Sequence, residues 1–579
     1  MRFAIFWIRS FPSVNRGWCR WPRALPYPRL LELREGTLPK TLMWAASRYA
    51  PRVAVVDGDR SLTYAALQQR VARFAHGLRS LGVRHGDHVA LWMTDCLEWM
   101  VARWAVPAIG AILVPINTRL RAEDISYLLS QSDTSVLIMA STFESIRYLD
   151  TLEKLVPNYL SQNRHGWQIR DFPNLRCVVI AGADRVPASM HDFAGIEQAA
   201  AQSGIDGEDL ASLSAGVEPD DVAQLVYTSG TTSMPKGAMV CHGALVENNY
   251  NAGEMTGLTP EDAFLLTVPS FSASGVAAHC QGLTHGSKLV LMARFDAEAF
   301  CRAVEKERIT SAFFADPIVY DLRHFPDRDK YDLSSLRTGS GAPLSESSFD
   351  FLSNEMAVPQ IVHSYGMSET SNVVSRTRCL EPRVVRRRAT GHPLPGVQVS
   401  IVSPESEMDL PDGEAGEIRV SGYTVMRGYY NKPAETAAVF DAAGRLRTGD
   451  LGYLNKFGEL VYAGRIKEML KVGGFNVAPG EIEGFLATYP GVARVAVVGV
   501  SDPRLGEVPF AYVVCRAGER IRAEDLVGHF KAGIAGYKLP KYVTFDDDWP
   551  MTATQKVQKK KLQERAQALV NTDAVPRLD

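Results

Sequence analysis

The segment "VYTSGTTSMPKGAMVCH", residues 226–242, follows a continuous apolar run and surrounds Gly230 with hydroxyl side chains before it reaches Lys236. Backbone N–H groups in a glycine-rich turn converge on anions, so the segment predicts a phosphate-binding loop. It lacks the P-loop NTPase motif, because Gly237 stands where that motif needs Ser or Thr after the lysine. Taken alone, the segment is also compatible with a hydroxyl-rich loop that caps a helix.

The bulk composition is that of an average globular protein. The chain has 579 residues, which is too long for one hydrophobic core and predicts two or more domains. The net charge of −2 provides no field that would attract nucleic acid or an anionic membrane. No apolar run approaches the roughly 20 residues that cross a bilayer, so we expect no transmembrane segment.

The eight cysteines are scattered along the chain and form no CxxC pair. This pattern predicts neither a zinc site nor a disulfide framework. Buried free thiols in a reducing compartment are the better interpretation, and we expect a cytoplasmic protein.

Residues 1–36 differ from the rest of the chain. They carry several arginines and no acid before Glu32, which faintly resembles an organelle transit peptide. The segment has neither a helical nor a strand period. We therefore expect a poorly ordered N-terminal extension.

Strand-like apolar runs recur from about Thr37 onward and alternate with segments of helical spacing. One such segment is 297–307, which Asp296 can cap at its N-terminus. Continuous apolar strands that alternate with helices are typical of sheets buried on both faces. The sequence therefore predicts an α/β fold with a large layered N-terminal domain over residues 37–465.

The pattern of strand-like runs changes after about Pro395. Short strands separated by glycines predict a small β subdomain at the end of the large domain. A further unit with its own strand-like runs occupies residues 466–579. We expect this unit to be a small, mobile C-terminal α+β lid domain.

Six further motifs follow the phosphate-loop segment. They are "SGAP" (340–343), "YGMSET" (365–370), "GEIRVSG" (416–422), "RTGDLG" (447–452), "GRIKEMLKVGGFNVAPGEIE" (464–483) and "TATQKVQKKKL" (552–562). Together with "TSGTTSMPKG" they resemble, in identity and order, the signatures of the adenylate-forming (ANL) superfamily. Within this superfamily, the motifs resemble those of acyl-CoA synthetases, the AMP-dependent acid–CoA ligases. The resemblance extends from about residue 37 to about residue 562.

The resemblance implies a nucleotide site. The residues expected to hold the ATP phosphates are Thr228, Ser229, Gly230, Thr231, Thr232 and Lys236, and those expected to hold Mg²⁺ are Glu369 and Thr228. The remaining residues of the nucleotide site are expected to be Gly339, Ser340, Gly341, Ala342, Ser364, Tyr365, Gly366, Ser368, Asp450 and Arg465. Tyr365 would stack on adenine, and Asp450 would accept hydrogen bonds from the ribose, although a structural ion pair with Arg465 is the alternative.

The chemistry of adenylation explains why such a site needs positive charge. A carboxylate and a phosphate about 4 Å apart repel each other by about 4 kcal/mol at an effective dielectric constant near 20. Fixed cations, oriented N–H donors and a divalent metal offset this repulsion. The resemblance assigns catalytic roles to Lys556, Glu369, Thr228 and Lys236, with Lys556 carried by the C-terminal domain.

Lys467 stands where the hinge of the family lies, so the resemblance implies that a rotation there would withdraw Lys556 after adenylation. The opposite face of the lid, with Lys471, Gly473 and Gly474, would then approach the pantetheine arm of coenzyme A. Rotation about a few residues is a known mode of domain switching.

Three residues depart from the family pattern. Ser233 and Gln555 stand where the family more often has glycine, and Ser272 stands where many relatives have a histidine after the aromatic residue. His279 could supply an imidazole in place of Ser272, although a lone histidine is more often structural. The segment 268–280 resembles the wall of the acyl site.

The sequence thus predicts an ATP-dependent carboxylic acid–CoA ligase. It would convert an acid and ATP to acyl-AMP and pyrophosphate, then use CoA to form acyl-CoA and AMP. A fatty, an alicyclic and an aryl acid all remain open. The alternatives are a stand-alone adenylating enzyme that loads a carrier protein, and a non-catalytic nucleotide- or acyl-binding protein of the same fold. Expected partners are ATP, Mg²⁺, coenzyme A and a small carboxylic acid, without nucleic acid; a homodimer is left open.

Overall fold

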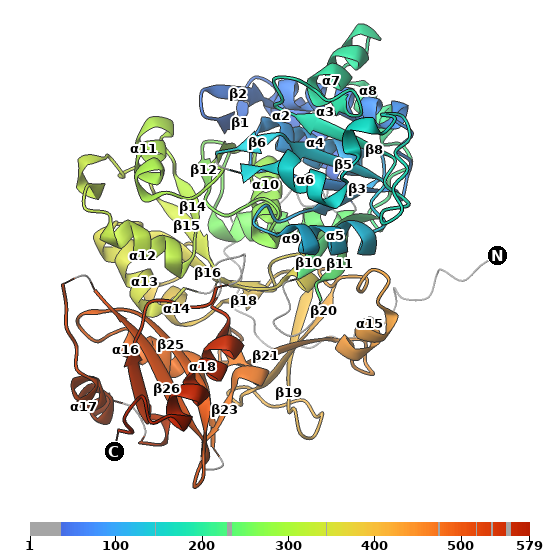
Figure 1. Cartoon of the computed structure of the whole chain (residues 1–579). Helices are drawn as coiled ribbons and strands as arrows, with labels where there is room; N and C mark the ends of the chain where they lie inside the picture. Colours follow the sequence, from blue (N-terminus) through green and yellow to red (C-terminus); the bar gives the residue numbers. More distant parts are fainter. Residues whose placement is uncertain are drawn as a thin grey trace.

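The computed structural model describes residues 36–144, 146–228, 234–342, 344–472, 475–516, 518–533, 536–551 and 557–578. The predicted N-terminal extension therefore lies outside the described residues, apart from Gly36. Figure 1 shows a large body formed by the N-terminal and central parts of the chain. A smaller body, drawn in orange and red, is formed by the C-terminal part.

A mostly parallel seven-stranded sheet forms one layer of the large body. Its strands in spatial order are β11 Lys236–Cys241, β10 Val222–Thr228, β4 Ile112–Pro115, β3 His88–Trp92, β5 Val136–Ala140, β8 Cys177–Ala181 and β9 His191–Asp192. Neighbouring strands are parallel except for β10 and β11, which pair antiparallel with Thr228 opposite Lys236. The two ends of the predicted phosphate loop are therefore held side by side.

A nine-stranded sheet forms the second layer. Its strands in spatial order are β18 His392–Pro393, β17 Ser375–Arg376, β16 Gln360–Tyr365, β15 Thr338–Gly341, β14 Ser311–Phe314, β12 Ala263–Leu266, β13 Lys288–Leu291, β1 Val53–Asp57 and β2 Arg60–Thr63. The strands from β16 to β1 are parallel, and antiparallel strands lie at both edges. The motifs "GSGAP" and "YGMSET" begin at the carboxyl ends of two adjacent strands, β15 and β16.

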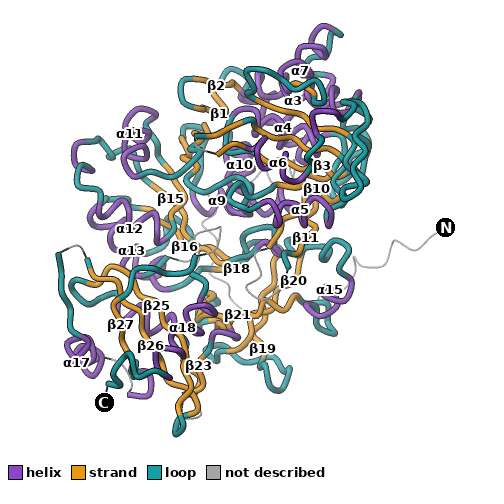
Figure 2. The backbone as a smooth tube through the Cα atoms, in the orientation of Figure 1, coloured by secondary structure: helices purple, strands orange, loops and turns teal. Residues whose placement is uncertain are grey.

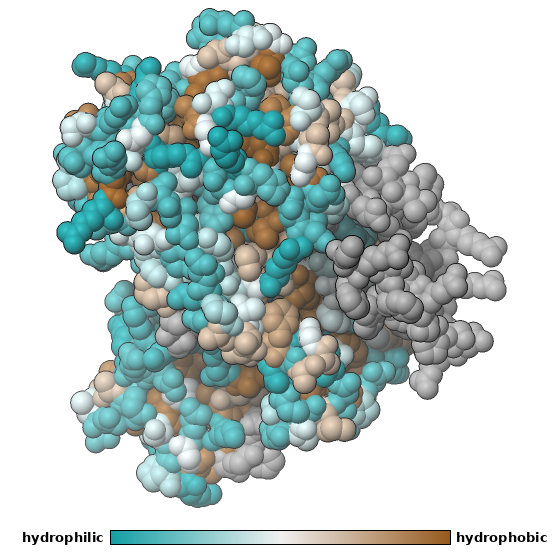
Figure 3. All heavy atoms as spheres, turned by 90° about the vertical axis from the view of Figure 1, so that its right-hand side faces the viewer, coloured by the Kyte–Doolittle hydropathy of each residue, from teal (hydrophilic) through white to brown (hydrophobic). Residues whose placement is uncertain are grey.

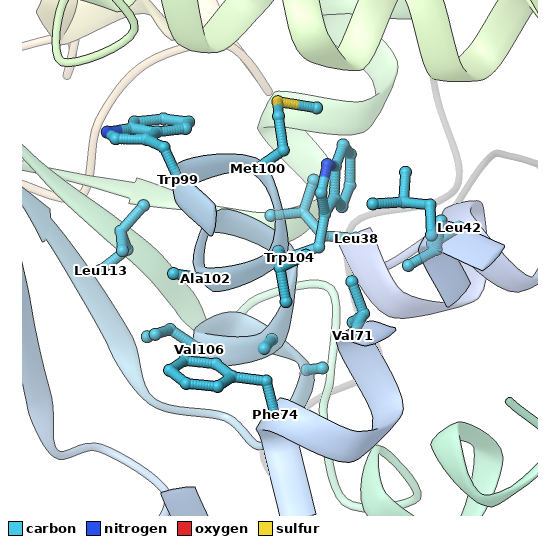
Figure 4. Close-up of a cluster of buried hydrophobic side chains, with 14 of the residues drawn as sticks. Leu38, Leu42, Val71, Phe74, Trp99, Met100, Ala102, Trp104, Val106 and Leu113 are labelled. Atoms are coloured by element: carbon cyan, nitrogen blue, oxygen red, sulfur yellow. The ribbon is translucent and has the colours of Figure 1, made fainter. Parts of the chain in front are cut away.

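A layer of apolar helices lies between the two sheets. It comprises α2 Leu38–Tyr49, α3 Tyr64–Ser80, α4 Leu97–Ala108, α9 His242–Thr256 and α10 Ala273–His285. Figure 4 shows Trp99, Met100 and Trp104 of α4 among the buried side chains of this cluster. Because burying one large apolar side chain contributes roughly 1.5–3 kcal/mol, this core fixes the two sheets relative to each other.

Other helices cover the outer faces. The seven-stranded sheet is covered by α5 Ala122–Gln131 and α6 Tyr148–Leu155, and the nine-stranded sheet by α11 Ala297–Glu307, α12 Asp316–His324 and α13 Glu346–Asp350. Two more helices, α7 Phe193–Gln202 and α8 Asp209–Leu213, pack on α3. The predicted helix 297–307 and its cap are confirmed, since the Asp296 carboxylate accepts a hydrogen bond from the Ala299 N–H at 2.9 Å.

The predicted small β subdomain is a four-stranded antiparallel sheet. Its strands are β19 Val397–Val402, β20 Gly416–Gly422, β21 Leu446–Leu454 and β22 Leu460–Arg465, and the helices α14 Arg383–Arg388 and α15 Pro433–Val439 lie near it in the chain. Figure 2 shows β19, β20 and β21 below the ends of β10 and β16. This sheet therefore faces the place where both large sheets end.

The C-terminal body has a sheet of its own. Its strands are β23 Leu470–Val472, β24 Phe475–Val477, β25 Val492–Asp502, β26 Gly506–Cys515 and β27 Tyr542–Phe545. Its helices are α16 Pro479–Leu486, α17 Ala523–Gly533 and α18 Lys559–Asn571. One apolar cluster joins α16 and α17 to the sheet, and another joins α18 to its other face. The predicted α/β fold class, with a large N-terminal domain and a smaller C-terminal one, is confirmed.

The surface is of mixed hydropathy. Figure 3 shows one face on which hydrophilic residues are mixed with smaller apolar areas. In the part of the chain that the structure describes, no helix combines the length and the apolar character needed to cross a membrane. The seven described cysteines are free thiols. Three of them are buried as predicted (Cys177, Cys280 and Cys301), whereas Cys96, Cys241, Cys379 and Cys515 are only partly buried.

Candidate active site

The structure describes most of the predicted site residues. They are Thr228, Lys236, Gly339, Ser340, Gly341, Ala342, Ser364, Tyr365, Gly366, Ser368, Glu369, Asp450, Arg465, Lys467 and Lys471. The predicted residues that lie outside the described ranges are Ser229, Gly230, Thr231, Thr232, Gly473, Gly474 and Lys556, as do Ser233 and Gln555.

Lys236 and Glu369 both contact the side chain of Tyr429, Lys236 at the ring and Glu369 at the hydroxyl. The Lys236 Nζ lies 4.5 Å from the centroid of the Tyr429 ring, a cation–π distance. The Tyr429 hydroxyl donates a hydrogen bond to Glu369 Oε1 at 2.8 Å. Burial, together with the charge of Glu369, raises the pKa of Tyr429, so the phenol stays protonated and remains a donor. The cation and the carboxylate are thus positioned by one shared side chain.

Glu369 lies in the short turn η4 Ser368–Thr370, which packs against β10 and β11. The N–H of Met426 donates to the Glu369 carbonyl at 2.8 Å, and the Glu369 side chain is only 7% exposed. Thr228 ends β10, with its Oγ1 3.5 Å from the Lys236 carbonyl oxygen. Both ends of the predicted phosphate loop therefore lie beside the predicted metal ligand.

Gly366 allows the chain to turn tightly before Glu369. A Cβ at this position would lie 1.6 Å from the backbone oxygen of Asn372. Asn372 itself has a φ of 104° and Ser371 a φ of 54°, so the far side of the turn has a left-handed backbone. Such a backbone persists only where surrounding contacts fix it, and here the Ser371 hydroxyl donates to the Thr424 carbonyl at 2.8 Å.

Tyr365, Asp450 and Arg465 form a second cluster. The Tyr365 hydroxyl donates to Asp450 Oδ2 at 2.8 Å, and the Arg465 Nε lies 3.2 Å from Asp450 Oδ1. The Tyr365 ring stacks on Tyr462 with centroids 5.7 Å apart. Burial raises the pKa of Asp450, an effect that Arg465 opposes. Oδ1 accepts no hydrogen bond from the described residues despite its burial, which leaves an acceptor for a ligand hydroxyl.

The predicted residues of β15 and β16 line up beside this cluster. Gly341 approaches Leu344 so closely that an added Cβ would lie 2.2 Å from its side chain. Ser340 is buried, whereas Ala342 is exposed. The Ser364 hydroxyl accepts a hydrogen bond from the Nε of buried Arg376 at 2.8 Å. Ser364 therefore supports the site through Arg376, whose pKa burial lowers to about 9.

The predicted hinge and lid residues lie on the C-terminal side. Lys467 in η5 Ile466–Glu468 and Lys471 in β23 are both exposed. The Lys559 Nζ lies 2.8 Å from Glu483 Oε1 and 3.5 Å from Glu468 Oε2. These pairs connect the start of α18 to the hinge turn.

A cavity of about 270 Å³ lies where strands of both large sheets end. Its lining residues are Thr94, Asp95, Thr118, Arg119, Phe143, Glu144, Ile146, Thr267, Pro269, Phe271, Met292, Ala293, Arg294 and Phe295. It shares Pro269 and Phe271 with the predicted acyl-site wall. On its rim, the Arg294 Nη1 lies 3.0 Å from Glu144 Oε2.

Ser272 has a structural role next to this cavity. Its Oγ accepts a hydrogen bond from the Gly275 N–H at 3.1 Å and donates to the Pro269 carbonyl at 2.7 Å, so it caps α10. His279 is 1% exposed and lies behind Ser270, with Nε2 2.9 Å from the Ser270 Oγ. Burial lowers the pKa of His279 well below its usual value, which keeps the imidazole neutral. These contacts agree with the structural interpretation of this histidine.

The donor set near Glu369 suits magnesium. A buried carboxylate and the hydroxyl of Thr228 are hard oxygen donors, and Mg²⁺ commonly takes one or two carboxylates plus phosphate oxygens. Within the described ranges, no group of three or more His, Cys, Asp or Glu residues could hold a metal ion. The residues therefore fit an ion that also binds the phosphates of ATP.

The sequence analysis missed Tyr429 and Tyr462. Tyr429 lies 193 positions after Lys236, and backbone hydrogen bonds between residues 237–239 and 427–430, with an isolated bridge between Ala238 and Tyr429, bring the two segments together. Tyr462 belongs to β22, one of the short strands that the glycine pattern after about Pro395 predicts. Its distance from Arg465 gave no local signal, because the two residues are three positions apart and only alternate residues of a strand share a face.

Asp450→Asn is expected to raise the KM for ATP by about tenfold, because a hydrogen bond to a charged group contributes about 1.5–3 kcal/mol. The amide can still accept from Tyr365, but it places an N–H next to Arg465. Steady-state kinetics with varied ATP measure the effect. Glu459→Gln is the matched control, since Glu459 is also a buried acid of this subdomain and accepts from Asn455 instead. An unchanged KM in Asp450→Asn would contradict the ribose role.

Comparison with known proteins agrees with the motif pattern. A family model described as "AMP-binding enzyme" matches residues 42–430, and one described as "AMP-binding enzyme C-terminal domain" matches residues 481–556. The acyl-CoA synthetase YngI of Bacillus subtilis is 34% identical over 94% of this chain and 99% of its own length.

Two further relatives extend the comparison. A CoA ligase of Rhodococcus jostii, named for a methyl-dioxo-octahydroindenyl propanoyl group, is 36% identical over 91% of this chain and 98% of its own. The crystal structure of ATP-bound MatB from Rhodopseudomonas palustris has a TM-score of 0.77 and 25% identity, and it covers 92% of this chain and 99% of that one. These similarities extend over both bodies of the molecule.

Proposed function

Since this chain belongs to the AMP-binding enzyme family and is an acyl-CoA synthetase, we propose that the cluster around Glu369 carries out its adenylation step. In this step a carboxylate oxygen attacks the α-phosphate of ATP and pyrophosphate leaves. In the second step a thiol sulfur attacks the acyl carbon, and AMP leaves. The observation that supports this assignment is the convergence of Lys236, Tyr429 and Glu369 beside Thr228.

Each member of the cluster has a role in this proposal. Lys236 binds a phosphate oxygen while the Tyr429 ring keeps its ammonium group in place. Glu369 and Thr228 hold Mg²⁺, which when bound offsets negative charge on the phosphates. Glu369 remains oriented by Tyr429 throughout. Together these residues reduce the repulsion between the carboxylate and the triphosphate.

The Tyr365 cluster binds the nucleoside in the same proposal. Asp450 accepts hydrogen bonds from the ribose hydroxyls through Oδ1. This buried oxygen accepts no hydrogen bond from the described residues. Arg465 opposes the rise that burial causes in the pKa of this carboxyl group. The backbone of β15, with Gly339, Ser340, Gly341 and Ala342, borders the base next to Tyr365. Gly366 and Ser368 bring the chain from the base to the α-phosphate.

The cavity beside Phe271 is the entry for the thiol arm of coenzyme A in this proposal. Asp95 lines it, and a carboxylate substrate would be repelled by that residue. A neutral thiol would not be repelled. Arg119 and Arg294 at the rim suit the phosphates of CoA. The acyl group then lies on the other side of the segment 268–280.

Lys556→Ala is expected to slow adenylation by about 10²-fold, because the lysine stabilises charge that develops between the carboxylate and the α-phosphate. Conversion of a supplied acyl-adenylate and CoA to the thioester should stay near the wild-type rate. Pyrophosphate release and CoA consumption measure the two steps separately. Lys561→Ala, an exposed lysine of the same basic run, is the matched control. Equal losses in both steps would exclude this role.

A boundary between Arg465 and Ile466, with Lys467 as the pivot, is part of the same proposal. The separate apolar clusters of the C-terminal body support it. Lys471, Gly473 and Gly474 would face the thiol arm after the rotation. A cytoplasmic location is supported by the free thiols, and a homodimer stays a prediction.

A panel of acids tests the proposed function. We expect pyrophosphate release with ATP, Mg²⁺ and CoA for at least one fatty, alicyclic or aryl acid, together with the matching acyl-CoA. A holo-carrier protein offered in place of CoA distinguishes the carrier-loading alternative. Absence of pyrophosphate release with every acid would favour the non-catalytic alternative.

A further inference from the structure

Asp95 is a buried carboxylate that borders the cavity beside Phe271. It follows β3 and lies just before α4, and it is 5% exposed. Its two carboxylate oxygens lie 3.1 and 3.3 Å from the Ser270 N–H, which donates to them. Ser270 in turn bonds to His279 through its hydroxyl. Asp95 is therefore held by backbone while one side of it faces the cavity.

The other ionisable groups at the cavity are poorly placed to take a proton. Glu144 is at the rim and is paired with Arg294. His279 is buried behind Ser270 and does not line the cavity. The Ser272 position, where relatives often carry an imidazole, holds a hydroxyl that caps α10. Among the described lining residues, Asp95 is the buried acid that can reach a molecule in the cavity.

The cavity lies next to the adenylation cluster. Its wall at Pro269 and Phe271 continues directly into the first turn of α10. In that turn the Ser274 hydroxyl lies 3.3 Å from Asn372 Oδ1, in the loop that carries Glu369. The cavity wall is thus joined, through the first turn of α10, to the loop that carries Glu369.

We propose that Asp95 accepts the proton of the CoA thiol in the second half-reaction. Asp95 takes the proton while the thiol lies beside it in the cavity, and the S–H bond breaks. The thiolate sulfur then attacks the acyl carbon, and the C–S bond forms. The bond between that carbon and the phosphate oxygen breaks, and AMP leaves with its electron pair. The proton passes from Asp95 to water through the cavity. This inference rests on the proposed use of the cavity by the thiol arm.

The surroundings of Asp95 shift its pKa in the direction that proton transfer requires. Burial raises the pKa of Asp95 to about 7, an effect that the hydrogen bonds from Ser270 oppose. A base with a pKa near the working pH is the most effective for proton transfer. The charged or titratable groups that face Asp95 from neighbouring elements are Asp57, Cys96, Tyr148 and His279, with Arg119, Glu144 and Arg294 around the cavity.

Asp95→Asn tests the proposal, because the amide oxygen still accepts from Ser270 but takes up no proton. Synthetic hexanoyl-AMP and benzoyl-AMP, supplied with CoA, report the second half-reaction alone. At pH 7 we expect its rate to fall about 10²-fold in the variant, while pyrophosphate release in the first half-reaction stays at the wild-type value.

The pH profile separates a proton acceptor from a structural residue. The wild-type rate of thioester formation should fall below about pH 7, where Asp95 is protonated, and level off above it. The Asn variant should instead keep rising toward about pH 8.5, where a free thiol ionises by itself. Glu144→Gln, at the rim of the same cavity, should keep the wild-type profile.

Three results would overturn the proposal: parallel pH profiles, equal losses in both half-reactions, or an unchanged rate at pH 7. Thermal unfolding of the variant shows whether the fold is retained. Failure of the proposed function is distinguishable, since the wild-type protein would then release no pyrophosphate with any acid.

Discussion

Glu369→Gln is expected to lower the rate of pyrophosphate release by about 10³-fold. The amide has the shape of the carboxylate and can still accept the hydrogen bond from Tyr429. It lacks the negative charge that is proposed to hold Mg²⁺. The rate measured over a range of Mg²⁺ concentrations should recover only in part at high Mg²⁺.

Tyr429→Phe is the control for this variant. It keeps the aromatic face under Lys236 and the charge of Glu369 but removes the hydrogen bond between them. That bond contributes about 1.5–3 kcal/mol, so a loss of roughly tenfold is expected. If Glu369→Gln lost no more activity than Tyr429→Phe, the charge of Glu369 would not be required, and its metal role would be wrong.

Gly366→Ala is expected to slow adenylation by more than about 10²-fold and to lower the midpoint of thermal unfolding. The new Cβ would lie 1.6 Å from the Asn372 carbonyl oxygen and 2.7 Å from its carbon. Both are backbone atoms that cannot rotate away. The turn must therefore open, which moves Tyr365 and Glu369 away from their partners. Pyrophosphate release and differential scanning calorimetry measure the two effects.

Gly484→Ala is the matched control for the glycine variant. Gly484 lies in α16 and is exposed, and an added Cβ would meet no atom within 4 Å. Alanine in a helix is favoured over glycine by roughly 0.5–1 kcal/mol, so the variant should be slightly more stable with unchanged activity. Wild-type behaviour of Gly366→Ala would show that the turn adapts more easily than its contacts indicate.

Much of the fold could be predicted from the sequence because its signals are local. The apolar runs of β3, β5 and β8 have the length and composition of buried strands, and Asp296 marks the start of α11. The pairing of the strands into two sheets could not be predicted in the same way. It depends on contacts such as that of β1 with β13, which no local pattern encodes.

The residues of the site could be predicted only where they lie in motifs of the family. Glu369 and Asp450 lie in motifs of the family, and the structure adds the tyrosines that orient them. Asp95 belongs to no motif used in the sequence analysis, and its role depends on a hydrogen bond to Ser270, 175 positions away. Burial of this kind follows from packing and leaves little trace in the residues on either side.

Lys559 joins the first turn of α18 to Glu468 and Glu483. All three residues follow Arg465 in the chain, so the hinge turn is fastened to the smaller body. If that body rotated as a rigid unit, Glu468 would move with it. The change in backbone dihedral angles would then be concentrated between Arg465 and Lys467. Because these side chains are partly buried, salt screens their ion pairs much less than exposed ones, so the turn should stay attached to the smaller body at physiological ionic strength.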